Sequence, residues 1–96
     1  MANGTFLLEA YLPTMCAGDA AATSARAYAA AEQMAGEGTA IHLLRSFFLP
    51  EDELCFCLYD AHSIEVVAEA GRRAEMSLER IQPVVQLPRF ILRDGC

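Results

Sequence analysis

The pattern of apolar and polar positions is dominated by two apolar runs, residues 41–49 and 54–61, which are joined by a short polar loop. Two such runs around a loop of about four residues predict an antiparallel hairpin. Apolar side chains stand next to each other in both runs, for example at Phe47 and Phe48. Because neighbouring strand residues point to opposite faces, the hairpin has two apolar faces, and both need cover.

The remaining segments complete a regular order of elements. The pattern predicts a strand over 6–12, a helix over 20–35, a helix over 64–75 and a last strand over 81–87. Asp19 and Ser63 are the expected N-caps of the two helices, and Gly36 is the expected stop of the first. Prolines at 83 and 88 confine the last strand to an edge of the sheet.

The order strand, helix, strand, strand, helix, strand predicts an α+β fold of the ferredoxin-like βαββαβ type, with a four-stranded antiparallel sheet and two helices on one face. Residues 1–96 then form a single domain with a core over about 6–88. Two helices cover one face of such a sheet, so the other apolar face calls for a second copy. We therefore expect a homodimer of the dimeric α/β barrel type.

Composition and charge narrow the functional classes. The chain is 54% hydrophobic and 21% charged, which excludes disorder, and its net charge of -6 argues against nucleic acid as a partner. The apolar run 6–12 carries Glu9 and has no basic leader, so it indicates neither a signal peptide nor a membrane span. We expect a cytoplasmic protein with no membrane partner.

The four cysteines favour free thiols over a disulfide framework. Cys55 and Cys57 lie two apart on one face of a strand, where bridging geometry is poor. Cys16 and Cys96 are distant in sequence, and a Cys-x-Cys spacing is a weak signal for structural zinc. All four cysteines are therefore expected to be reduced.

Polar side chains within the strands are the candidate ligand-binding residues, namely Glu9, His42, Ser46 and Asp60. Strict alternation places His42 and Ser46 on one face, with Arg45 on the other. If all four candidates share the face turned away from the helices, the dimer encloses a polar and apolar cavity. Glu9, His42 and Asp60 are then the candidate ligands of a divalent cation. The alternative is that Asp60 caps a turn, Ser46 bonds to backbone and His42 lies in solvent.

Two stretches, FLLEAYLP near the start and LLRSFFLPEDELCFCLYDAHSIEVVAEAGRRAEMSLERI from the hairpin onward, carry a resemblance. They resemble a small bacterial family of unknown function, typified by a nickel-binding protein with a ferredoxin-like fold and a dimeric assembly. The resemblance implies the same fold and assembly, and it names nickel as the metal. Where the resemblance implies a histidine on the second helix, this chain has Ala70.

Two functional classes remain, because no nucleophile motif, phosphate loop or dinucleotide fingerprint is present. The first is a homodimer that binds a small ligand or a metal ion without chemistry. The alternative is a cofactor-free enzyme of the dimeric α/β barrel type, a cyclase, isomerase or monooxygenase acting on an aromatic or polyketide-like molecule. In that case Glu9, Asp60 or His42 would serve as the acid or base.

Overall fold

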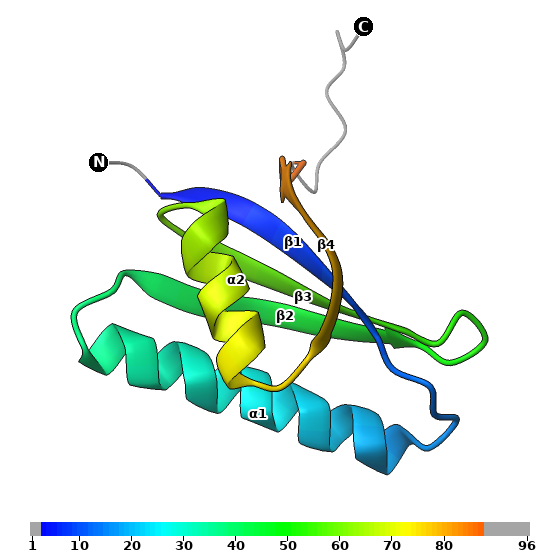
Figure 1. The fold of residues 1–96 in the computed structure, drawn as a ribbon. Coiled ribbons are helices and arrows are strands. Elements are labelled where there is room, and N and C mark those ends of the chain that lie inside the picture. Colours follow the sequence, from blue (N-terminus) through cyan, green and yellow to red (C-terminus); the bar gives the residue numbers. More distant parts are fainter. Residues whose placement is uncertain (1–2, 88–96) are drawn as a thin grey trace, which may run out of the picture.

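The computed structural model describes residues 3–87 and has the predicted order of elements (Figure 1). They are β1 (Gly4–Tyr11), α1 (Ala17–Gly36), β2 (Ile41–Leu49), β3 (Leu54–Ala61), α2 (Ile64–Arg73) and β4 (Ser77–Val84). The strands form one sheet in the order β2-β3-β1-β4, and every neighbouring pair is antiparallel. Both helices lie over one face of this sheet (Figure 1). The predicted ferredoxin-like fold is confirmed.

Helix α1 begins earlier than predicted, and Asp19 is not its N-cap. Cys16 takes the N-cap position and makes no side-chain cap bond. The hydroxyl of Thr14 accepts the Cys16 N–H at 3.0 Å and donates to the Asp19 carboxylate at 2.8 Å. Asp19 therefore lies inside the first turn, where a negative charge favours the positive end of the helix dipole. The helix ends at Gly36, as predicted.

Helix α2 has the predicted start and the predicted outer face. The hydroxyl of Ser63 accepts the backbone N–H of Val66 at 3.3 Å, which confirms Ser63 as the N-cap. Glu69 pairs with Arg72 and Arg73 one turn further along. Arg73 also reaches Glu37 at 3.0 Å, so this outer face ties α2 to the end of α1.

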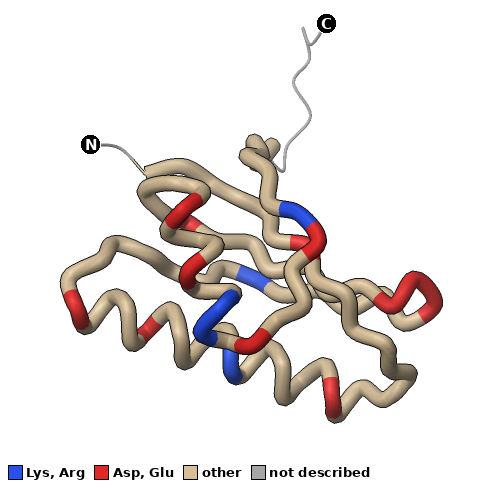
Figure 2. Tube along the Cα trace, in the orientation of Figure 1, with Lys and Arg blue, Asp and Glu red and all other residues tan. Residues whose placement is uncertain are grey.

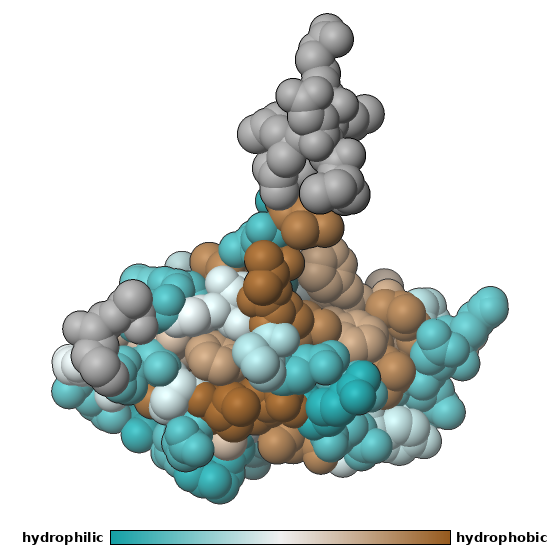
Figure 3. Space-filling view, turned by 90° about the horizontal axis from the view of Figure 1, so that it is seen from above, coloured by the Kyte–Doolittle hydropathy of each residue, from teal (hydrophilic) through white to brown (hydrophobic). Residues whose placement is uncertain are grey.

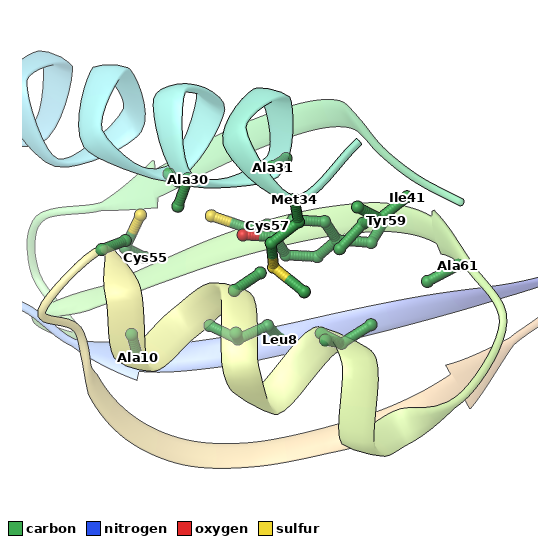
Figure 4. Close-up of a cluster of buried hydrophobic side chains, with 14 residues drawn as sticks. Leu8, Ala10, Ala30, Ala31, Met34, Ile41, Cys55, Cys57, Tyr59 and Ala61 are labelled. Carbon is green, nitrogen blue, oxygen red and sulfur yellow. The ribbon is translucent and has the colours of Figure 1, made fainter. Parts of the chain in front are cut away.

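The core lies between the two helices and the sheet (Figure 4). Helix α1 contributes mainly alanines and Met34 to it, while β3 contributes Cys55, Cys57 and Tyr59. In α2, a Cβ atom added at Gly71 would lie 2.8 Å from the Cδ1 atom of Leu8. Small residues on both helices therefore let them approach the sheet closely.

Strand β4 spans Ser77–Val84, so the prediction of a strand over 81–87 is displaced. Helix α2 ends at Arg73, and Glu75 has a φ of 60°, a left-handed turn that returns the chain to the sheet within a few residues. Pro83 lies near the end of this edge strand opposite Phe6. An edge strand tolerates proline because one of its sides has no partner to which an N–H would donate.

Strand β2 contains an extra residue that changes which side chains share a face. Leu43 pairs with Tyr59, but the next paired residue is Arg45, which is opposite Leu58. Leu44 is therefore a bulge, and the alternation of faces reverses after it. Ile41 is fully buried beneath the helices, whereas His42 is exposed on the other side.

Charged residues surround this framework without forming a basic surface. Figure 2 shows acidic positions spread over the described chain, including the β2–β3 turn at the right end, and few basic ones. Among the described residues, no helix combines the length and apolar character that crossing a membrane requires.

Candidate functional site

The face of the sheet turned away from the helices, here called the open face, holds three of the four predicted site residues. The register assigns to it the following side chains: Thr5, Leu7, Glu9 and Tyr11 of β1; His42, Arg45, Phe47 and Leu49 of β2; Leu54, Phe56, Leu58 and Asp60 of β3; and Ser77, Arg80, Gln82 and Val84 of β4. Tyr11, Phe47 and Leu49 are exposed. Seen from above, apolar residues form a band across the middle of the molecule, with hydrophilic residues at both ends (Figure 3).

His42 and Asp60 lie directly opposite each other on β2 and β3. On the other side of Asp60, the paired residue is Thr5 of β1. The side-chain amide of Asn3 donates to the Asp60 carboxylate at 3.5 Å. An imidazole and a carboxylate thus share one end of the open face, where His42 is exposed and Asp60 is partly exposed.

Glu9 lies at a different place on the open face. Its carboxylate oxygen Oε1 is 3.7 Å from Nε of Arg80, and its side chain is 21% exposed. Asp60 pairs with Thr5, four residues before Glu9, so their backbones are about 13 Å apart along the sheet. Accordingly, no three His, Cys, Asp or Glu side chains within residues 3–87 are grouped to hold a metal ion.

Ser46 is not on the open face, so the prediction that it shares a face with His42 is wrong. The bulge at Leu44 reverses the alternation, and Ser46 pairs with Cys57 on the side that faces α1. Arg45 lies on the open face instead, opposite Leu58. A bulge leaves no residue signature in an apolar run such as 41–49, so sequence alternation gave no warning of this reversal.

A second polar group, here called the thiol cluster, lies beneath α1 and consists of Cys55, Cys57, Tyr59, Ser46 and Ser24. The Ser24 hydroxyl donates to that of Ser46 at 3.0 Å, and Ser46 Oγ is 3.7 Å from Cys57 Sγ. Cys16, Cys55 and Cys57 are free thiols, as predicted, while Cys96 lies outside the described residues. The thiol cluster thus places hydroxyl and thiol groups beside the apolar side chains of the core.

The Tyr59 hydroxyl belongs to the thiol cluster and is fully buried. It has no hydrogen-bond partner among the described residues. Figure 4 shows its oxygen pointing toward the sulfur of Cys57. An unpartnered buried hydroxyl costs about 1–3 kcal/mol, which makes this position unusual for a purely structural core.

The two buried thiols differ in how readily they lose a proton. A hydrogen bond from Cys57, against the opposing effect of burial, lowers the pKa of Cys55 to about 7. The pKa of Cys57 is raised well above the ordinary thiol value by its hydrogen bond to Cys55 and by burial. Burial also raises the pKa of Tyr59. At neutral pH the pair therefore shares at most one negative charge.

Three surface hollows are all lined by residues of α1 and not by Glu9, His42 or Asp60. One of them, with a volume of about 190 Å³, lies between α1 and the hairpin, and Cys55, Ser46 and Ser24 are among its lining residues. The thiol cluster is thus reached from the helix side. A cavity on the open face would require a second molecule to close it.

The sequence reasoning missed Arg80 and Ser24. A carboxylate inside an apolar strand requires a partner, so the search for one would have led to a basic residue near the last strand. Arg80 was missed because the predicted last strand began at residue 81, whereas β4 begins at Ser77. Ser24 has no such signal, because a lone serine in an alanine-rich helix is ordinary.

Ala70 takes the place at which the resemblance implies a histidine. It is fully buried, on the side of α2 that faces the sheet. This position is therefore separated from His42 and Asp60 by the thickness of the sheet.

The chain is similar to known proteins in both sequence and fold. The model of the family described as "Nickel responsive protein SCO4226-like" matches residues 6–84. The crystal structure of SCO4226 from Streptomyces coelicolor A3(2) has a TM-score of 0.68 to this chain at 19% sequence identity, covering 88% of this chain and 99% of that one. No curated protein matches the sequence. The match runs from within β1 to the end of β4, and the chain belongs to the family of nickel-responsive, SCO4226-like proteins.

Proposed function

We propose that this chain is one subunit of a homodimer that binds a divalent metal ion between the open faces of two sheets. The observation that carries the proposal is the open face itself. It exposes large apolar side chains toward one end and, at the other end, an imidazole and a carboxylate that one chain leaves short of a complete metal site. The description of the family as nickel responsive supports nickel(II) as the metal to test first.

The apolar part of the open face supports the dimer. Phe47 is 49% exposed and Tyr11 is 43% exposed, although both lie within strands of the sheet. Covering exposed aromatic side chains with another apolar surface removes a large apolar area from water, which is favourable in free energy. A two-fold axis brings the same surface of a second copy against the first, so one patch serves both subunits.

The polar part of the open face supports the ligand. His42 and Asp60 offer one nitrogen and one or two oxygens, a donor set that suits nickel or zinc. In a dimer whose two-fold axis passes close to this residue pair, the second subunit supplies a second imidazole and a second carboxylate. The four side chains would then enclose a cation that one chain cannot hold alone.

Glu9 has a separate role in this proposal. The nearby guanidinium of Arg80 competes with a cation for its carboxylate. A second metal position at Glu9 therefore requires Arg80 to move aside. Glu9 and Arg80 together instead suit the polar end of a small organic ligand in the same space.

Calorimetric titration of nickel(II) with light scattering tests the proposal. We expect a dimer and about one metal ion per dimer, because two copies complete one site. His42→Gln and Asp60→Asn should each abolish this binding, and Glu9→Gln should leave it nearly unchanged. His62→Gln is the matched control, since His62 is an exposed imidazole in the β3–α2 loop. A monomer, or nickel binding that survives both His42→Gln and Asp60→Asn, would contradict the proposal.

A further inference from the structure

The thiol cluster has the composition of a binding site for a different kind of ion. Cys55 and Cys57 are 2% and 0% exposed, and both belong to the face of β3 that carries the core. Figure 4 shows both sulfur atoms on the side that faces α1. Alternate residues of one strand are separated by about 6.6 Å between Cα atoms, at the upper limit for a disulfide. The strand therefore holds the two sulfurs side by side but disfavours joining them.

Hydroxyl groups surround the two thiols, although apolar side chains would serve the packing of the core equally well. The hydroxyl of Ser46 lies 3.7 Å from the Cys57 sulfur and is itself hydrogen-bonded by Ser24. The hydroxyl of Tyr59, which is fully buried and has no hydrogen-bond partner within residues 3–87, points at the same sulfur. Hydroxyl groups around a sulfur stabilise it as a thiolate by donating hydrogen bonds. The unpartnered Tyr59 hydroxyl is thus poised for a charge that the free protein does not fully develop.

A route to the thiol cluster is present as well. The hollow of about 190 Å³ between α1 and the hairpin is lined by Cys55, Ser46 and Ser24. It is large enough for a hydrated monovalent ion to enter and small enough to exclude a bulky organic ligand. Helix α1 contributes mainly alanines to the core, together with Met34, whose thioether sulfur is itself a soft donor.

We infer that Cys55 and Cys57 bind a soft, thiophilic cation of the copper(I) class as a two-sulfur site, independently of any metal on the open face. Two sulfur donors without a nearby imidazole or carboxylate select a soft ion rather than a hard one. Ions such as zinc prefer four ligands, and residues 3–87 do not group even three. On binding, each thiol releases its proton to solvent, and the sulfur electron pairs form the two bonds to the cation.

Silver(I) and anaerobic copper(I), measured by native mass spectrometry after desalting, test this site directly. The starting protein is the Cys16→Ser/Cys96→Ser variant, which keeps both buried cysteines. We expect it to retain one equivalent of silver(I) or copper(I) after desalting and to melt at a higher temperature with the ion bound. No retention by this variant, or retention that disappears with Cys16 and Cys96, would overturn the inference.

Ligand variants give the second measurement. Cys55→Ala and Cys57→Ala should each lose the bound ion, whereas His42→Gln should keep it, which separates this site from the open face. Should either alanine variant fail to fold, Tyr59→Phe decides the question. Loss of an outer hydrogen bond weakens metal binding by about 10-fold or more, while a purely structural tyrosine would leave the affinity unchanged.

Discussion

At the scale of single residues, the Tyr59 hydroxyl is the least expected feature of the molecule. The core around it consists of alanine, leucine, isoleucine, valine, methionine and cysteine side chains, and phenylalanine would fill nearly the same volume. The hydroxyl loses its contacts with water on folding and gains no partner among the described residues. Its desolvation is therefore an uncompensated cost in the metal-free protein.

Replacing Tyr59 with phenylalanine is expected to stabilise the metal-free protein. Removal of an unpartnered buried hydroxyl should raise the free energy of unfolding by about 1 kcal/mol. Urea denaturation followed by circular dichroism measures the change. Tyr28→Phe is the matched control, because Tyr28 is 54% exposed on α1 and its hydroxyl stays hydrated. A loss of stability in Tyr59→Phe would mean that the hydroxyl has a bonding partner in solution.

Because of the paired thiols, the free energy of unfolding of the metal-free protein should vary with pH above about pH 7. From about pH 7 to 9.0 the folded protein keeps Cys55 ionised while the unfolded chain binds its proton, so stability rises with pH. Above pH 9.0 the unfolded chain ionises Cys57 and the folded protein keeps it protonated, so stability falls with pH. Each group contributes a slope of about 1.4 kcal/mol per pH unit in its window.

We therefore expect a stability maximum near pH 9.0 that depends on the two buried cysteines. Thermal melts from pH 7 to 10.5 on reduced, metal-free protein measure the profile. The Cys55→Ala/Cys57→Ala variant should lack the maximum, and Cys16→Ser should retain it. If the native chain and both variants show the same pH profile, the maximum does not come from Cys55 and Cys57.

At the scale of elements, the sequence predicts best where local signals act alone. The hairpin loop, the Ser63 cap and the Glu69 pairs with Arg72 and Arg73 are all local, and the structure confirms them. Strand β4 was misplaced, because its start depends on how α2 turns back after Glu75. The face of Ser46 depends on one extra residue whose position the partner strand sets, which no local pattern in an apolar strand encodes.

Two glycines in helices give opposite predictions for alanine substitution. At Gly36 nothing lies within 4 Å of an added Cβ, so Gly36→Ala should stabilise the protein by about 0.5–1 kcal/mol. At Gly71 an added Cβ meets Leu8 at 2.8 Å and Leu78 at 3.1 Å. Gly71→Ala should therefore destabilise by about 1 kcal/mol despite the better helix propensity.

Chemical denaturation of both glycine variants beside the native chain tests the close approach of α2. Destabilisation by Gly71→Ala should come with a lower unfolding midpoint and an unchanged slope, since the fold is kept. Equal stabilisation of both variants would show that α2 lies farther from the sheet than the structure places it.

At the scale of the whole molecule, the sheet separates two kinds of chemistry. Its helix-covered side carries sulfur and hydroxyl groups, and its open face carries an imidazole, carboxylates and aromatic rings. The sequence offered a shared open face for Glu9, His42, Ser46 and Asp60 as one of two alternatives, and the register places all of them there except Ser46. The sequence did not reveal that Glu9 pairs with Arg80, since that pairing depends on the register of β4.

A charge placed in the apolar part of the open face is expected to separate the proposed dimer. Phe47→Glu should give a folded monomer, because the side chain is half exposed in one chain and would be desolvated between two. Size-exclusion chromatography with light scattering measures the mass. Tyr28→Glu places the same charge on α1, which covers the opposite face of the sheet, and should leave the dimer intact because Tyr28 is 54% exposed. A dimer that persists in Phe47→Glu would show that the subunits meet through another surface.

The irregular outer strands limit how copies of this molecule can add to one another. Polymeric growth of a sheet requires a straight row of free N–H and C=O groups along its edge. The bulge at Leu44 breaks that row in β2, and Pro83 removes a donor from β4. Lateral addition of strands, the first step toward fibres, is therefore disfavoured at both edges of the sheet, although the molecule exposes large apolar side chains.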